Sequence, residues 1–139
     1  MAHIYPNKVR NNDGTYGPTS MLHFYKPASY HNPTARLRAD KTRWKLTEPQ
    51  QYEVFRVADE AYETYMDNRG GLYGFLDQME EVLGKDNEER IAYFPFPSTN
   101  PWHGYPIDSE DIDDDIIDRW KDSGIITRRT YIQLLKHRI

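Results

Sequence analysis

The sequence contains no cysteine at any of its 139 positions. This absence excludes a disulfide framework, a thiolate nucleophile and a zinc site built on thiolates, and it favours a reducing compartment. The first residues show no charged start followed by an apolar run, and no stretch approaches the roughly 20 apolar residues of a membrane helix. We therefore expect a cytoplasmic protein that is not associated with a membrane.

Motifs typical of metal and cofactor sites are also missing. No two histidines stand four residues apart in a predicted helix, and neither His-x-Glu nor His-Glu-x-x-His occurs. The spacing of Asp111, Asp113 and Asp115 resembles the start of a calcium-binding loop, but Ile116 stands where such a loop needs glycine. We predict neither a metal ion nor a cofactor.

Hydrophobic residues are few and aromatic residues are many. Hydrophobic types make up 37% of the chain and aromatic types 14%, including eleven tyrosines. Because each aromatic side chain buries a large area, a core can be built from a small number of them. The length fits one domain over residues 1–139. We predict an α+β fold in which a mostly antiparallel sheet is covered by about four helices.

The pattern along the chain divides this domain into four parts. They are an irregular β-rich basic segment, a helical pair, a strand with a loop rich in proline and aromatic residues, and a C-terminal helical pair: 1–46, 47–84, 90–108 and 109–139. Alternating patterns and short apolar runs predict strands at 4–9, 21–25, 35–40 and 90–96. Helical periodicity predicts helices at 47–69, 72–83, 110–122 and 128–137. Thr47 and Gln50 resemble a capping box, and Thr127 caps the last helix.

The net charge is −4, but the charges stand in blocks. Residues 1–46 carry eight basic and two acidic side chains, whereas residues 47–90 carry four basic and twelve acidic ones. Residues 108–122 carry two basic and eight acidic side chains, and residues 123–139 carry four basic and none acidic. Such blocks either pair within the molecule, which is the simpler interpretation, or face partners of opposite charge.

The predicted helix over 110–122 has a strongly acidic side. On a helical wheel one sector holds five aspartates: Asp111, Asp114, Asp115, Asp118 and Asp122. The opposite sector holds the apolar side chains of Ile112, Ile116 and Trp120. Like charges four residues apart destabilise a helix slightly. Solubility, a basic partner or a divalent cation would each account for this acidic side, and solubility is the simplest of the three.

Residues 93–108 form an unusual loop that contains four of the nine prolines. Prolines restrict the backbone on both sides of Gly104, which itself allows close approach. A loop this rigid can present His103 to a ligand or partner. Alternatively, Trp102 and Tyr105 fill the core beneath the loop, and His103 only bonds to the backbone.

The first functional hypothesis is a non-catalytic protein–protein interaction module. It would present acidic helix faces to a basic protein partner. Its candidate binding residues come from the loop and the acidic helix: Trp102, His103, Tyr105, Asp111, Asp114, Asp115 and Asp118. Small acidic chains without cysteine or motifs are typical of immunity, antitoxin and phage accessory proteins, which is an analogy of class only.

Two alternatives belong to other functional classes. A small hydrolase or nuclease would combine acid–base catalysis with anion stabilisation. Its candidate catalytic residues are His103, His23, Arg36 and Arg38. A nucleic-acid binder would use the basic strand within residues 1–46 or the last helix, over 128–137. The acidic helix argues against binding by the last helix because it repels phosphate, and the basic strand could instead pair with the protein's own acidic helices.

Overall fold

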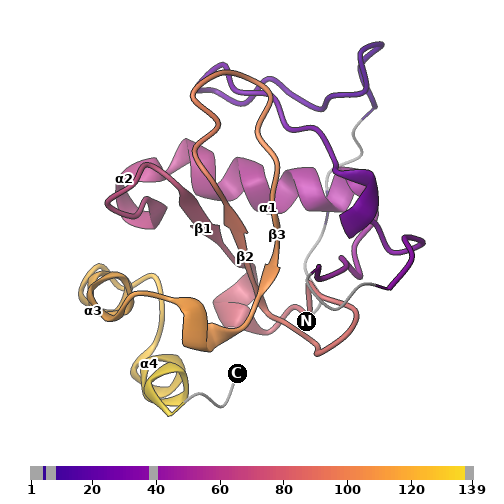
Figure 1. Ribbon diagram of the computed structural model, residues 1–139. Helices are drawn as coiled ribbons and strands as arrows, with labels where there is room; N and C mark the ends of the chain where they lie inside the picture. The colour runs from indigo at the N-terminus through magenta and orange to yellow at the C-terminus, as the bar shows by residue number, and fades with distance from the viewer. Residues whose placement is uncertain (1–4, 6–8, 38–40, 137–139) are drawn as a thin grey trace.

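The computed structural model describes residues 5, 9–37 and 41–136, which form a three-stranded antiparallel sheet and four α-helices (Figure 1). In order across the sheet, the strands are β1 (Leu72–Gly74), β2 (Ile91–Phe94) and β3 (Tyr105–Ile107). The helices are α1 (Glu48–Glu60), α2 (Tyr62–Tyr65), α3 (Asp114–Asp122) and α4 (Arg128–Leu135). Three short 3₁₀ turns are η1 (Ser29–His31), η2 (Asp77–Met79) and η3 (Ser109–Asp111). The predicted α+β class is therefore confirmed.

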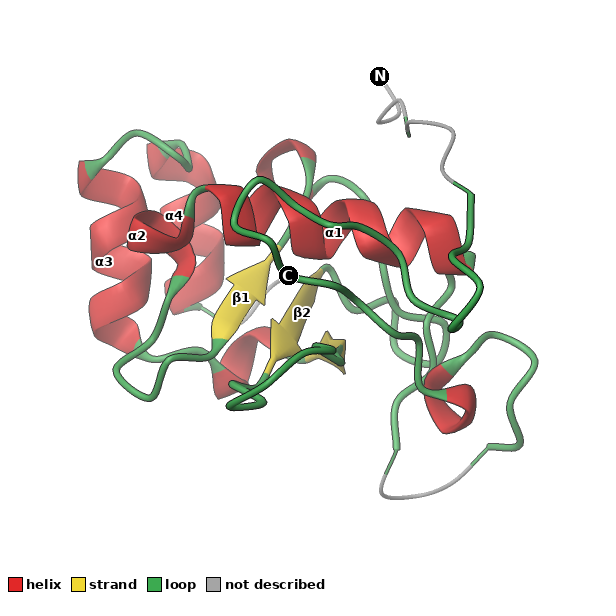
Figure 2. Ribbon diagram, turned by 90° about the horizontal axis from the view of Figure 1, so that it is seen from above, coloured by secondary structure: helices red, strands yellow, loops and turns green. Residues whose placement is uncertain are grey.

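The two faces of the sheet differ. α1 lies across one face, and α3 and α4 lie beyond the β1 edge (Figures 1 and 2). The register pairs Tyr73 with Tyr93 and Tyr93 with Tyr105, so these three side chains share the face opposite α1. We call them the tyrosine row. Phe94 points the other way, toward α1, where its ring centroid lies 5.4 Å from that of Phe55.

Aromatic side chains dominate the core, as the composition predicts. Phe94 is fully buried, and the ring centroids of Tyr25 and Trp44 lie 5.9 and 6.2 Å from its own. The polar atoms of these rings are satisfied: the Tyr25 hydroxyl donates to Gln51 Oε1 (2.9 Å), and Trp44 Nε1 donates to the Gly104 carbonyl (3.1 Å). A core of large rings therefore leaves few buried polar groups unpaired.

Two helix starts predicted from capping residues are confirmed. Thr47 and Gln50 form the capping box of α1, in which Thr47 N donates to Gln50 Oε1 over 2.9 Å. At the start of α4, the backbone N–H of Thr130 donates to the Thr127 hydroxyl over 3.2 Å. Both signals are local, so the sequence alone determines them.

The chain turns between α2 and β1 around a buried carboxylate. Asp67 Oδ1 accepts hydrogen bonds from the backbone N–H groups of Arg69 and Gly71, at 2.8 and 2.9 Å. Its Oδ2 accepts from the Tyr93 hydroxyl at 2.6 Å. These bonds stabilise a turn where the predicted helix over 47–69 would continue, so that helix ends at Tyr65. It is also interrupted at Ala61, whose φ of −125° and ψ of 41° are not helical.

The predicted helix over 72–83 is wrong, because β1 and η2 occupy this segment. The three residues of η2 have φ angles of 48°, 58° and 63°, a left-handed conformation that no right-handed helix contains. Contacts from distant residues hold the turn. Arg90 Nη1 donates to the carbonyls of Met79 (3.0 Å) and Glu80 (2.9 Å), so tertiary structure overrides the apolar periodicity.

The predicted strand over 21–25 is also wrong. Leu22 has a φ of 61° within a tight turn, in which its N–H donates to the Thr19 carbonyl over 2.9 Å. Only Tyr25 makes a β-bridge, antiparallel to Tyr16 and parallel to Trp102. The other backbone groups of this segment bond to Asn100 and Trp102 as well as to the turn itself, so they are not free to pair along a sheet.

Two other predicted strands lie partly outside the described residues. In the segment 35–40 the described residues 35–37 are irregular, and in the segment 4–9 the described residues 5 and 9 belong to no strand. The strand predicted over 90–96 is confirmed as β2. Within the described chain the sheet is therefore built wholly from the second half of the sequence.

The acidic helix is confirmed but shorter. η3 precedes it, and Asp113 serves as the N-cap of α3. Ile116 and Trp120 are buried as predicted, and Trp120 Nε1 donates to the Thr64 carbonyl over 3.0 Å. None of the helices in the described part of the chain has the length and apolar character needed to cross a membrane.

Both edges of the sheet meet other parts of the chain. At the β3 edge, Pro106 has no N–H to donate, and its carbonyl accepts a hydrogen bond from the Thr42 hydroxyl over 2.7 Å. At the β1 edge, Leu72 forms an antiparallel bridge with Met66. Neither edge presents an uninterrupted row of free backbone groups.

Candidate functional site

The loop between β2 and β3 packs against the core. Trp102 is only 3% exposed, and its ring centroid lies 5.5 Å from that of Phe55 and 5.4 Å from that of His23. Its backbone N donates to the Phe24 carbonyl (2.7 Å), and its carbonyl accepts from Lys26 N (2.9 Å). The structure therefore places Trp102, a predicted binding residue, in the core.

The four predicted catalytic residues are not brought together. His103 is exposed, and its Nδ1 lies 2.7 Å from the carbonyl oxygen of Lys26. Within the described residues no hydrogen bond joins His103 to His23 or to Arg36, which is exposed in an irregular segment. Arg38 lies outside the described residues. The arrangement needed for shared acid–base chemistry is therefore not observed in the described chain.

His23 pairs instead with a buried carboxylate. Its Nδ1 lies 2.8 Å from Asp59 Oδ1, and the Thr19 hydroxyl donates to Asp59 Oδ2 over 2.5 Å. An imidazole oriented by a carboxylate is the arrangement of a general base, and His23 lines a small cavity of about 150 Å³ together with Ser98. No hydroxyl in the described chain bonds to the His23 imidazole, so a nucleophile positioned for that base is not observed there. The pair ties the turn at residues 19–23 to the end of α1.

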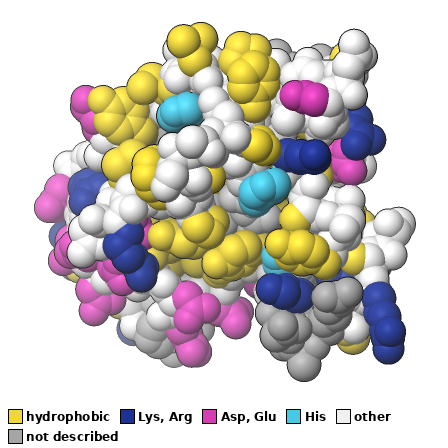
Figure 3. Space-filling view, turned by 45° about the horizontal axis from the view of Figure 1, so that its top comes forward, with side chains coloured by type: hydrophobic (Ala, Val, Ile, Leu, Met, Phe, Trp, Pro, Cys, Tyr) yellow, Lys and Arg dark blue, Asp and Glu magenta, His cyan; other side chains and the backbone are white. Residues whose placement is uncertain are grey.

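The face of the sheet opposite α1 carries a row of rings. In the tyrosine row the centroids lie 4.9 Å apart between Tyr73 and Tyr93, and 6.4 Å apart between Tyr93 and Tyr105. His31 extends the row by stacking on Tyr105 at 5.2 Å. Trp120 of α3 packs against Tyr73 at the other end, which leaves Tyr93 and Tyr105 half-buried between them. Figure 3 shows hydrophobic side chains across the middle of this side of the molecule.

The three phenols of the row have different partners. The Tyr73 hydroxyl donates to the Asp111 carbonyl (3.3 Å), and burial raises the pKa of Tyr73 to about 12. Burial and the hydrogen bond to Asp67 raise the pKa of Tyr93. Burial and then the charge of Asp111 raise the pKa of Tyr105, whose hydroxyl has no hydrogen-bond partner among the described residues. Tyr105 therefore stays protonated at neutral pH and can donate to a bound partner.

A cavity of about 310 Å³ adjoins Tyr105. Its walls include the aromatic ring of Tyr105 and two carboxylates of the segment leading into α3, Asp108 and Asp111. Lys41 also lines it, and its Nζ lies over the ring of Tyr30, 5.2 Å from the centroid. An aromatic wall next to carboxylates suits a cationic group that also offers hydrogen-bond donors.

The carboxylates of η3 and α3 form a surface that we call the acidic face. Its members are exposed: Glu110, Asp111, Asp113, Asp114, Asp115, Asp118 and Asp122. The two cations of α3 have other contacts, because Arg119 Nη1 donates to the Met66 carbonyl (2.8 Å) and Lys121 Nζ lies 4.8 Å from the ring centroid of Tyr131. No ion pair within the described residues neutralises the acidic face. Asp and Glu side chains gather at the lower left of Figure 3, on the side where Figure 1 places α3.

Outside the acidic face, some charged residues of the basic and acidic blocks form ion pairs with one another. Arg43 of the basic N-terminal block forms a 2.6 Å ion pair with Asp86. Within α1, Arg56 pairs with Glu53 (2.7 Å) and Glu60 (2.6 Å). Two acids of α1 thus share a local cation, whereas no member of the acidic face forms an ion pair within the described chain. Across the described chain no three His, Asp or Glu side chains gather closely enough to hold a metal ion.

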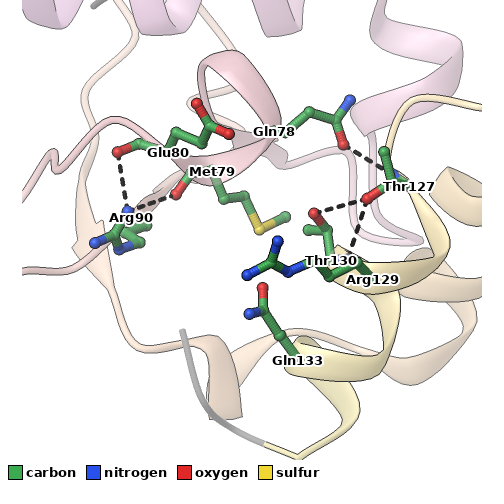
Figure 4. Close-up of a pocket in the computed structure, with 8 residues that line it drawn as sticks. All are labelled: Gln78, Met79, Glu80, Arg90, Thr127, Arg129, Thr130 and Gln133. Atoms are coloured by element: carbon green, nitrogen blue, oxygen red, sulfur yellow. Dashed lines mark hydrogen bonds between the residues drawn. The ribbon is translucent and has the colours of Figure 1, made fainter. Parts of the chain in front are cut away.

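A cavity of about 480 Å³ lies between η2 and α4 (Figure 4). We call it the arginine cavity, and its lining residues are Gln78, Met79, Glu80, Arg90, Thr127, Arg129, Thr130 and Gln133. Sequence reasoning misses it because it places η2 inside a helix. Two of the three consecutive left-handed residues, Gln78 and Met79, line the cavity, and this conformation has no sequence signature because none of the three is glycine.

Two members of the tyrosine row are absent from the predicted binding residues. Sequence reasoning assigns Tyr73 to a helix, so its place opposite Tyr93 is missed. The local signal for Tyr93 is the alternation along β2, because residues two apart share one face of a strand. Only Tyr105 was predicted from the sequence, and the structure places it between Tyr93 and the acidic face.

Lowering the pH below about 6.5 should destabilise the protein through His31. Burial lowers the pKa of His31 below its usual 6.5, and the nearby charge of Lys41 adds to this, although the bond to the Thr42 carbonyl opposes it. Below pH 6.5 the unfolded chain therefore binds the proton and the folded chain does not. Stability is complete above pH 6.5 and falls as the pH drops, by at most about 1.4 kcal/mol per pH unit.

Chemical denaturation at pH 7.5 and pH 5.5 measures this loss. In His31→Gln, which keeps a donor for the Thr42 carbonyl, the loss should be smaller than in the unchanged protein. An equal loss in both proteins would show that other groups cause the pH dependence.

The tyrosine row and the acidic face form one continuous surface. Tyr73 bonds to the backbone of Asp111, and the cavity beside Tyr105 is walled by Asp108 and Asp111. Half-exposed rings thus adjoin carboxylates that form no ion pair within the described chain. The chain matches no protein-family model, and neither the curated proteins nor the solved structures gave a match.

Proposed function

We propose that the protein is a non-catalytic interaction module that binds a basic protein partner through Tyr93, Tyr105 and the acidic face. The observation that supports this proposal most directly is the contiguity of half-exposed tyrosines with unneutralised carboxylates. Tyrosine is enriched at the centres of protein interfaces, where it supplies large contact area with little loss of conformational freedom. Charged residues at the rim favour association with a partner of opposite charge.

The acidic face is more than a solvated helix surface in this interpretation. Aspartates at four-residue spacing destabilise α3, and its own two cations contact other groups instead of offsetting them. A basic partner would remove this repulsion on binding. By analogy of class alone, such a module fits immunity, antitoxin and phage accessory proteins.

The two alternatives have weaker support. A hydrolase would need a nucleophile or substrate-binding group at His23, and the contacts of the His23–Asp59 pair are those of a structural tie between a turn and α1. A nucleic-acid binder would need a basic surface, and Arg43 of the N-terminal block is already paired with Asp86. The acidic face would also repel the phosphate backbone.

A peptide of ten arginines is a suitable probe for the basic partner. In an NMR titration at low salt, the largest amide shifts should fall on residues 105–122. The combined variant Asp114→Asn, Asp115→Asn, Asp118→Asn should bind the peptide about tenfold more weakly, because three exposed charges are lost. Tyr105→Ala should weaken binding by a similar factor without any change of charge.

The matched control removes three exposed carboxylates elsewhere: Glu63→Gln, Glu80→Gln, Glu88→Gln. Both triple variants change the net charge equally, so the control should bind the peptide within about twofold of the unchanged protein if the acidic face is the site. Equal weakening in the two triple variants would contradict the proposal. It would show attraction by net charge without a site.

A further inference from the structure

We infer that the arginine cavity binds the phosphate group of a small molecule. None of the residues that line this cavity is a predicted site residue or a member of the acidic face, so this inference does not depend on the proposed function. Its volume of about 480 Å³ falls within the range typical of small-molecule sites. Two guanidinium groups reach it from different elements, Arg90 from the start of β2 and Arg129 from α4.

Arg90 is held in place with donors to spare. Its side chain is half-buried, and Nη1 donates to the carbonyls of Met79 (3.0 Å) and Glu80 (2.9 Å). These bonds leave Nε–H and both hydrogens of Nη2 without a partner among the described residues. A guanidinium fixed in this way can bind two oxygens of one phosphate with little loss of conformational freedom.

Arg129 supplies the second positive charge. Figure 4 shows its guanidinium reaching from α4 beneath Met79 toward the middle of the cavity, next to the amide of Gln133. Arg129 has no hydrogen bond or ion pair with any other described residue. Glu80 also lines the cavity, but no ion pair joins its carboxylate to Arg90 or Arg129 within the described chain. Two cations that line one cavity and form no ion pair within the described chain favour an anionic ligand.

The wall opposite α4 is built in a conformation that costs free energy. Each residue of η2 is left-handed, and residues other than glycine adopt this conformation rarely. Gln78 fastens this turn to the segment before α4: its Nε2 donates to the Ile125 carbonyl (2.6 Å), and its Oε1 accepts from Thr127 N (2.9 Å). Unfavourable backbone conformations persist where surrounding contacts maintain them, and they cluster at ligand sites. The cavity is therefore preformed.

The test is a titration of the unchanged protein with inorganic phosphate, with chloride at equal ionic strength as reference. We expect saturable amide shifts at residues 78–80, 90 and 129–133. Arg129→Gln should weaken phosphate binding about tenfold, the loss expected for one charge-assisted contact. Arg128→Gln is the matched control, because it removes the same charge from the neighbouring exposed position, which does not line the cavity. Its affinity should stay within about twofold of the unchanged protein.

Three results would overturn the inference. The first is the absence of saturable shifts around the cavity, and the second is equal weakening in Arg129→Gln and Arg128→Gln. The third is tighter binding of acetate than of phosphate, which would assign the cavity to carboxylates. Because neither arginine belongs to the acidic face, a negative result in the phosphate titration would not contradict the proposed binding of a basic partner, which the arginine-peptide titration tests separately.

Discussion

Gly104→Ala should lower the stability of the protein by about 3 kcal/mol, which corresponds to a decrease in Tm of about 10 °C. A β-carbon at this position would overlap the ring of Phe94. Phe94 is fully buried among other large rings, so it has no free space into which it can move. The Gly104 carbonyl is also fixed by Trp44 Nε1, which prevents the backbone from retreating. Thermal and chemical denaturation measure the change.

A double-mutant cycle tests the physical cause. Phe94→Leu alone should destabilise the core, but it also makes room for the new methyl group. The combined variant Gly104→Ala, Phe94→Leu should therefore be more stable than the sum of the two single losses predicts, by about 1 kcal/mol or more. Simple additivity would mean that the clash with Phe94 is not the origin of the effect.

Asp67→Ala is expected to have the second largest effect, a loss of about 3 kcal/mol. The Asp67 side chain is fully buried and accepts hydrogen bonds from the backbone N–H groups of Arg69 and Gly71 and from the Tyr93 hydroxyl. Alanine would remove the acceptor of all three hydrogen bonds, and the bond from the Gly71 N–H is fully buried, so water cannot replace that acceptor. The turn that leads into β1 would lose the bonds that define it.

Tyr93→Phe separates the bond of Asp67 to the Tyr93 hydroxyl from its bonds to the backbone N–H groups of the turn. In the unchanged protein this substitution removes the hydroxyl group and leaves Asp67 Oδ2 without its donor, so it should be destabilising. In the Asp67→Ala background the phenol has already lost its acceptor, and Tyr93→Phe should then cost nothing or restore some stability. The same cost in both backgrounds would mean that the Tyr93–Asp67 bond contributes little.

Features encoded within a few residues could be predicted from the sequence. The capping box at Thr47 and Gln50 and the cap at Thr127 each join groups three residues apart, and both are observed. The buried side of α3 is likewise observed, because its period is set by the helix itself. The α+β class could be predicted because the chain contains both strand patterns and helix patterns, and each of these is local.

Features that depend on distant residues could not be predicted. The apolar spacing over 72–83 satisfies a helix, yet Arg90 stabilises a left-handed turn there through the Met79 and Glu80 carbonyls. The tyrosine row requires the register of three strands, which no local pattern specifies. The candidate site was therefore only half predictable: its carboxylates are contiguous in sequence, but its rings come together only in the fold.

The closed β3 edge determines how any partner can approach the tyrosine row. Many sheets recruit a peptide by strand addition, in which main-chain hydrogen bonds extend the ladder. Here Pro106 interrupts the donors of the outermost strand, and Thr42 occupies its carbonyl. A ligand is thus prevented from extending the ladder at this point and has to be recognised by side chains on the face. The same obstruction protects a small sheet with exposed aromatic rings from edge-to-edge aggregation.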